Sequence, residues 1–330
     1  MSSPSSKPGL TVAVTGPTGT FGSALVPLLE ADDAVSRVVG VARSEFDPAS
    51  KGWTKLEYRQ GDVRRREDLD EAFAGVDVVV HLAFLILGSD PQTSRAINIE
   101  GTLNTFRAAA AAGAQRFVYA SSIAAYGFHA DNPVGIKEDW PTRPADTLFY
   151  AQEKAELEKL LAEEAEHAPD LDVYVLRPPI VLGPNAVGGK VSLPGWVTAA
   201  ASAIPKRLPP LPIPVPDLPI QFIHQDDVAS ALLRCVLAEG PPGAYNIAAD
   251  ETLTTSEIVK LFGGIPVPLP AGAAHAAARA AARVPGLPQP AQWIETLAHP
   301  AVMDTTKARD ELGWIPRVSA RDALLETLRG

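Results

Sequence analysis

Short apolar runs rich in β-branched residues alternate with helical patterns over the first half of the chain. The runs predict strands, at residues 10–14, 38–41, 76–82, 115–120 and 171–176. The helical patterns lie at residues 21–29, 98–112 and 149–166. Parallel strands joined by helices form right-handed crossovers and leave helices on both faces of the sheet. The pattern therefore predicts an α/β fold with a doubly wound parallel sheet.

The second half of the chain is rich in proline. Of the 31 prolines, 22 lie from Pro169 onward, and six lie within residues 209–219. Proline breaks helices and cannot donate a hydrogen bond to a central strand, so this segment predicts a loop or an extended arm over a pocket. Beyond it, residues 220–224 predict a strand and 226–237 a helix. Residues 245–248 predict a strand that returns to the main sheet.

Composition and charge exclude several classes of protein. Lys and Arg total 29 against 39 Asp and Glu, a net charge of -10, which argues against a nucleic-acid partner. No apolar stretch approaches the ~18 residues that span a bilayer, and the first residues lack a signal-peptide core. We therefore expect a cytoplasmic protein with no membrane contact. The single cysteine, Cys235, excludes an internal disulfide and a Cys-rich zinc site, and we expect no metal site.

Three glycines follow the first predicted strand and open the first predicted helix. Gly16 permits a tight turn, Gly19 lets the backbone approach a pyrophosphate, and Gly22 allows close packing of helix on strand. The free amides of the helix start then face the phosphates. Turns alone also use glycine, and the spacing is G-x-x-G-x-x-G, but the placement favours a dinucleotide. The residues expected to contact it here are Gly16, Thr18, Gly19, Thr20, Phe21 and Gly22.

The end of the second predicted strand indicates which dinucleotide is bound. An acidic side chain there accepts from the ribose 2′-hydroxyl of NAD, but this chain has Ala42, Arg43 and Ser44. A guanidinium suits a 2′-phosphate, so NADP is favoured and NAD stays possible. Arg43 as an ordinary surface arginine is the alternative. Asp62, beside Val63, is either an acceptor for the adenine amino group or a turn aspartate.

Tyr150 and Lys154 place a phenol and an ammonium four residues apart, on one face of a predicted helix. This spacing is common by chance. Ser121 and Ser122, however, follow the strand at residues 115–120, where the active-site loops of doubly wound sheets lie. The combination favours a catalytic site.

Together these motifs resemble the extended class of the short-chain dehydrogenase/reductase family, of the NAD-dependent epimerase/dehydratase type. The resemblance covers about residues 10–330. Further motifs that carry it are His81-Leu82-Ala83, Asn98 with Gly101-Thr102, Leu176-Arg177-Pro178, 222–227 and 312–314. It implies a Rossmann-type doubly wound parallel sheet with a smaller C-terminal substrate-binding domain. The implied divisions are a flexible tail at 1–9, an NADP-binding Rossmann domain at 10–180 plus 220–249, and the substrate-binding domain at 181–219 plus 250–330.

The resemblance also implies roles for individual residues. Tyr150 is expected to exchange a proton with the substrate oxygen, which Ser122, in preference to Ser121, holds by a hydrogen bond. Lys154 is expected to hold the nicotinamide ribose and to stabilise the phenolate; lowering a phenol pKa from ~10 to ~7 takes roughly 4 kcal/mol. Asn98 is either the family's structural asparagine or a helix-start side chain. The cofactor-lining residues implied beyond the glycine loop are Arg43, Ser44, Asp62, Val63, Leu82, Ala83, Tyr150, Lys154 and Pro178.

The choice of reaction depends on the residues expected around the substrate. Epimerases of this class often carry a diphosphate-binding arginine where this chain has Ile220, and a diphosphate without cations is costly to desolvate. The arm at 208–219 suits an apolar wall, although Lys206 and Arg207 could still serve a sugar nucleotide. We therefore expect an oxidoreductase acting on a small or apolar carbonyl or the matching alcohol. A nucleotide-sugar epimerase/dehydratase is the alternative, and a non-catalytic dinucleotide-sensing regulator is less favoured.

Members of the family commonly pair through two helices, here the predicted helices at 98–112 and 149–166. The resemblance therefore implies a homodimer. A monomer whose acidic second helix faces water is the alternative.

Overall fold

A computed structural model describes residues 9–86, 91–145, 148–186, 212–270, 272–273 and 299–327. Its centre is a seven-stranded parallel sheet in the order β11-β7-β5-β4-β1-β2-β3. The strands are β1 (Leu10–Thr15), β2 (Val35–Ala42), β3 (Leu56–Gln60), β4 (Val78–His81), β5 (Arg116–Ala120), β7 (Asp172–Arg177) and β11 (Gly243–Asn246). The strand order reverses direction at β1, as in a doubly wound Rossmann-type sheet, and this confirms the predicted fold class.

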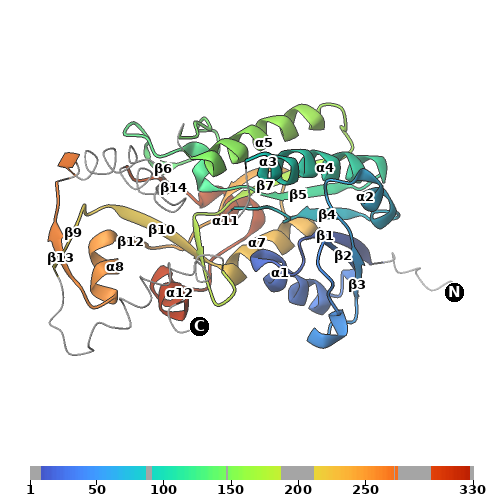
Figure 1. Cartoon of the computed structure of the whole chain (residues 1–330), viewed down its shortest axis with the longest axis horizontal. Helices are drawn as coiled ribbons and strands as arrows, with labels where there is room; N and C mark the ends of the chain where they lie inside the picture. The colour runs from blue at the N-terminus through green and yellow to red at the C-terminus, as the bar shows by residue number, and fades with distance from the viewer. Residues whose placement is uncertain are drawn as a thin grey trace.

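Helices cover both faces of the central sheet (Figure 1). One face carries α1 (Thr20–Ala31) and α7 (Gln225–Leu237); the other carries α2 (Arg66–Ala72), α4 (Gly101–Ala111) and α5 (Phe149–Ala165). Side chains alternate between the two faces along each strand. In β1, Val12 and Val14 pack in the core beneath α1 and α7, whereas Ala13 packs in the core beneath α4 and α5. Burial on both faces explains why the strands read as continuous apolar runs.

Smaller sheets lie beyond the carboxyl ends of the central strands (Figure 1). One has the order β12-β10-β8, and two pairs join β13 to β9 and β14 to β6. Their bounds are β6 (Val134–Ile136), β8 (Ile180–Leu182), β9 (Pro212–Val215), β10 (Pro219–His224), β12 (Thr252–Thr254), β13 (Ile265–Pro268) and β14 (Val302–Met303). The remaining helices are α3 (Pro91–Arg95), α8 (Thr255–Leu261), α11 (Thr306–Leu312), α12 (Ala320–Thr327) and the short turns η1 (Pro48–Lys51), η2 (Ala96–Glu100) and η3 (Ile123–Tyr126).

Most of the predicted elements are confirmed, with one difference. The helix predicted at 98–112 is preceded by the π-helical turn η2, so Asn98 lies within a turn and not at a helix start. The strand predicted at 220–224 is β10, which pairs with β8 and β12 in the smaller sheet. β11 returns to the central sheet as predicted. The domain division itself stays a prediction, and residues 1–8 of the expected tail lie outside the described residues.

The proline-rich arm is described from residue 212 onward. Among the described residues, its strand β9 pairs with β13 alone, in a two-stranded sheet where proline is tolerated. Residues 208–211 of the arm, together with Lys206 and Arg207, lie outside the described part of the chain. Within that part, no helix combines the length and the apolar character needed to cross a bilayer.

Candidate active site

A cavity of about 580 Å³ opens at the carboxyl ends of the central strands. The loops that follow β1, β4, β5 and β7 line one side, and β8, β10 and residues 299–301 line the other. Ligands of doubly wound sheets bind at this edge, next to the point where the strand order reverses. The predicted glycine loop and the predicted catalytic residues therefore meet at one cavity.

The glycine loop closes tightly against the start of α1. Gly16 has φ +73°, a conformation that favours glycine, and its amide donates to the Val41 carbonyl at 2.9 Å. A Cβ atom on Gly22 would lie 2.3 Å from the Gly16 carbonyl oxygen, so any side chain there would push the helix away from the loop. Gly19 is the N-cap of α1 and leaves the first amides of the helix free of a side-chain cap. The loop has the shape that a pyrophosphate requires.

Tyr150 and Ser122 meet at the floor of the cavity. Tyr150 lies in the first turn of α5, and Ser122 is the N-cap of η3, where its Oγ accepts from the Ala124 amide at 3.1 Å. Burial raises the pKa of Tyr150 above its ordinary value, and a hydrogen bond with Ser122 opposes that shift. The phenol is therefore protonated at neutral pH in this state and directed at the serine.

Lys154 lies one helical turn from Tyr150 and is 3% exposed. Its Nζ donates to the Ala120 carbonyl at 2.7 Å and to the Tyr119 hydroxyl at 3.1 Å. Burial lowers the pKa of Lys154 to about 7, against the pull of Glu158 and Glu153, whose charges raise it. The charge of this ammonium is therefore finely balanced near neutral pH.

The two neighbouring serine hydroxyls have different partners. Ser121 Oγ donates to Glu158 Oε1 at 2.5 Å. Glu158 also forms a buried ion pair with Arg177, at 2.5 Å between Nη2 and Oε2. Arg177 in turn donates to the Tyr126 hydroxyl at 2.5 Å, and this network joins α5 to β7 and η3. Ser121 is committed to this network, whereas Ser122 faces the cavity beside Tyr150.

A buried hydrogen-bonded chain fixes His81 in its neutral form. Burial, followed by the charge of Lys154, lowers the pKa of His81 to about 3. Thr102 donates its hydroxyl proton to the Asn98 carbonyl at 2.5 Å, so it accepts from His81 Nε2 at 2.9 Å. His81 Nδ1 then accepts from the Thr15 hydroxyl at 2.8 Å, which assigns the tautomer by this network. His81 is thus held in place by two hydrogen bonds and is uncharged at neutral pH.

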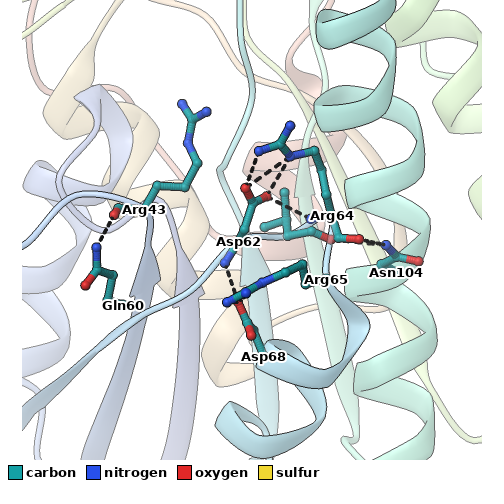
Figure 2. A network of polar contacts seen from close by, with 8 residues as sticks. Arg43, Gln60, Asp62, Arg64, Arg65, Asp68 and Asn104 are labelled. Atoms are coloured by element: carbon teal, nitrogen blue, oxygen red, sulfur yellow. Dashed lines mark hydrogen bonds and ion pairs between the residues drawn. The ribbon is translucent and has the colours of Figure 1, made fainter.

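The ends of β2 and β3 bring Arg43 and Asp62 together (Figure 2). Arg64 binds both carboxylate oxygens of Asp62, with Nε–Oδ distances of 3.0 Å, and this contact lowers the pKa of Asp62. The Gln60 amide donates to the Arg43 carbonyl at 2.8 Å. The Arg43 guanidinium forms no hydrogen bond or ion pair with the described part of the chain and extends past Asp62 in Figure 2.

Comparison with known proteins gives the family. Residues 12–248 match the profile of the NAD dependent epimerase/dehydratase family. The chain belongs to this family. It is thus an NAD(P)-dependent enzyme of the extended short-chain dehydrogenase/reductase class, and the predicted resemblance is confirmed.

Several proteins are similar to this family member over nearly its whole length. The uncharacterized protein y4nG of Sinorhizobium fredii is 30% identical, over 96% of this chain and 77% of its own. A UDP-glucose 4-epimerase from Thermotoga maritima, solved with UDP-glucose, is 21% identical with a TM-score of 0.72, over 97% of this chain and 98% of its own. DesIV, a dTDP-glucose 4,6-dehydratase from Streptomyces venezuelae solved with NAD, is 24% identical with a TM-score of 0.71. The similarity covers 97% of this chain and 96% of its own. The solved structures share the fold.

Most predicted site residues of the family member line the main cavity, but some do not. Those that line it are Gly16, Gly19, Thr20, Phe21, Gly22, Leu82, Ser122, Tyr150, Lys154 and Pro178. Thr18 lines a neighbouring cavity of about 480 Å³. The backbone amide of Ala83 donates a hydrogen bond to the Thr15 hydroxyl, and Val63 is buried against Gly101. Arg43, Ser44 and Asp62 lie at the ends of β2 and β3, beyond the lining of either cavity.

Several residues at the two cavities were not predicted from the sequence. Lys51, at the end of η1, and Trp53, just after it, line the smaller cavity with Thr18, and no motif marks them. Phe84 lines the main cavity and directly follows the His81-Leu82-Ala83 motif, so its position near the site could have been predicted from the sequence. Its contact with Lys154 could not. Within the described residues, no group of three or more His, Cys, Asp or Glu side chains is arranged to hold a metal ion.

Proposed function

We propose that this enzyme is an NADP-dependent oxidoreductase that reduces an apolar carbonyl or oxidises the matching alcohol. The observation that carries the proposal is that Ser122, Tyr150 and Lys154 line the same cavity as the glycine loop. A proton donor and a dinucleotide cradle at one cavity suit hydride transfer to a carbonyl.

The chain's own residues fit a bound dinucleotide. The close contact that only glycine permits at Gly22 keeps the start of α1 against the loop, with its amides turned toward a pyrophosphate. When bound, the nicotinamide cofactor supplies the hydride. Tyr150 gives its proton to the substrate oxygen, which Ser122 holds by a second hydrogen bond. Lys154, charged beside it, stabilises the phenolate that remains and holds the nicotinamide ribose.

Two cations support NADP over NAD. Ala42 leaves no carboxylate at the end of β2 to repel a 2′-phosphate, and the neighbouring Arg43 guanidinium is unpaired within the described residues. Lys51 lines the smaller cavity with Thr18, Gly19 and Thr20 of the glycine loop and is a second cation near it. Asp62, held in place by Arg64, is proposed to accept from the adenine amino group.

The cavity wall supports an apolar substrate. Apolar side chains of the described residues dominate the lining contributed by β8, β10 and the residue before β10, at Ile180, Val181, Leu218, Pro219 and Ile220. Ile220 stands where an epimerase of this class often has a cation. Of the described lining residues, Lys154 is the one lysine or arginine, and its Nζ is already bonded to Ala120 and Tyr119. A substrate diphosphate would have to be desolvated without a matching charge.

A nucleotide-sugar epimerase/dehydratase is the second candidate. It is favoured by the family itself and by the similarity over 97% of this chain to an epimerase solved with UDP-glucose. Calorimetry with UDP separates the two candidates. Our proposal predicts a dissociation constant weaker than millimolar, which is ~4 kcal/mol of binding. Micromolar UDP binding, with no carbonyl-dependent oxidation of NADPH, would make the epimerase reading the better one.

A further inference from the structure

Three aromatic rings surround the Lys154 ammonium. Its Nζ lies 3.6 Å from the ring centroid of Phe84, 4.7 Å from that of Tyr119 and 5.8 Å from that of Tyr150. A cation over a ring face within about 6 Å is attracted to the π electrons, most strongly when it is shielded from water. Phe84 is the nearest ring and stands at 90° to that of Tyr150, at 5.7 Å between centroids. It has no polar atom, so its contact with the ammonium is made by the ring face alone.

The loop that carries Phe84 is clamped to the helix that carries Lys154. Asn98 Oδ1 accepts from the Leu85 amide at 2.8 Å, and its Nδ2 donates to the Leu85 carbonyl at 2.9 Å. The same Nδ2 donates to Glu153 Oε2 at 2.7 Å, and Glu153 is 1% exposed. The side-chain amide of Asn98 therefore links Leu85, which follows Phe84, to Glu153, which precedes Lys154. These bonds hold the backbone next to Phe84 against the helix that carries Lys154.

The other groups around Lys154 leave its charge unsettled. On α5, the negative charges of Glu158 and Glu153 raise the pKa of Lys154. Glu158 is also paired with Arg177, whose positive charge offsets part of this effect. From the strands, the Tyr119 phenol and His81 face it, both neutral at pH 7 because burial raises the pKa of the first and lowers that of the second. Burial of Lys154 itself lowers its pKa to about 7. A modest attraction therefore decides how much of the ammonium is charged at neutral pH.

We propose that Phe84 is a positioning residue for Lys154, whose ring covers the ammonium and keeps it charged beside Tyr150. The consequence for turnover rests on the proposed function, because only there does a charged Lys154 stabilise a phenolate. The contact itself does not depend on which reaction the enzyme catalyses.

Competitive acetylation of the whole chain with acetic anhydride between pH 5 and 10 tests this proposal. Only the neutral amine reacts, so the labelling midpoint of the Lys154 peptide, measured by mass spectrometry, gives the pKa. Replacing the ring in Phe84→Leu is expected to lower this midpoint by about one pH unit. Phe84→Tyr, which keeps a ring, is expected to leave it within a few tenths of a unit. Phe128→Leu makes the same change elsewhere in the cavity and is expected to leave the midpoint in place.

The outcomes are distinct. An unchanged midpoint in Phe84→Leu, or an equal shift in Phe128→Leu, overturns the proposal. An upward shift also overturns it, because that is the result if the ring only excludes water. If Phe84→Leu does not fold, Phe84→Met against Phe84→Tyr gives the same comparison. A parallel fluorescence titration with NADPH separates the two claims: a lowered midpoint in a chain that binds no NADPH supports the role of Phe84 and contradicts the proposed function.

Discussion

The residues that matter most at the site are those whose charge the fold has shifted. Burial moves the phenol of Tyr150 toward the protonated form and the ammonium of Lys154 toward the neutral form. Both pKa shifts favour the uncharged form of the side chain. At neutral pH only Lys154 is near its titration point, so a cofactor or substrate that changes the local charge shifts the protonation of this ammonium most easily.

The shifted pKa of Lys154 predicts a pH-dependent stability. Its pKa is about 7 in the folded chain against an ordinary 10.5, so between these pH values the unfolded chain holds the extra proton and folding gains stability as pH rises. Lys154→Met removes this dependence. The unfolding free energy of the variant relative to wild type is expected to fall by up to about 1.4 kcal/mol per pH unit between pH 7 and 9. Urea unfolding at three pH values measures it, and a difference that stays constant would contradict the assignment.

Sequence reasoning at the residue scale succeeded where a motif fixed the position. The choice of Ser122 over Ser121 is supported by the commitment of Ser121 to Glu158. Lys51 and Phe84 were missed because their roles depend on contacts between loops, and a loop contact leaves no periodic trace in a sequence. Asn98 was left between two interpretations, and only its clamp on Leu85 distinguishes a structural asparagine from a helix-start side chain.

At the scale of elements, the ends of strands carry the function. β1, β4, β5 and β7 each end at the main cavity, so the residue after each strand enters the site without any long side chain being needed. The alternation of strands and helices predicted this arrangement because parallel crossovers place all carboxyl ends at one edge. The sheet to which β10 belongs was not predictable in the same way. A five-residue segment such as Ile-Gln-Phe-Ile-His shows that a strand forms but not which strand it pairs with.

The end of β2 predicts a cofactor preference. Arg43→Ala is expected to weaken NADP binding by ~1–3 kcal/mol, as for a lost charge-assisted contact, and to leave NAD binding nearly unchanged. Calorimetry with both dinucleotides measures this. Arg37→Ala is the matched control, because Arg37 lies on β2, just ahead of Arg43, but is paired with Glu57. Equal weakening of both cofactors in Arg43→Ala, or tighter binding of NAD by wild type, would overturn the preference.

At the scale of the whole molecule, α4 and α5 lie side by side on one face of the sheet (Figure 1). An ion pair between Arg107 and Glu164 joins them, at 2.5 Å. We propose that two chains pair through these helices, as the family resemblance implies. Light scattering at micromolar concentration is expected to give twice the mass of one chain. A monomer mass of 34.8 kDa would show that this face meets water instead.

The most direct test of the proposed chemistry is the oxidation of NADPH, followed by absorbance, with a panel of apolar ketones and aldehydes. Wild type is expected to oxidise NADPH in a carbonyl-dependent way. Tyr150→Phe keeps the ring that packs on Phe84 but lacks the transferable proton, so turnover is expected to fall at least tenfold while NADPH affinity changes little. Retention by Tyr150→Phe of more than about a tenth of the wild-type rate would contradict the account.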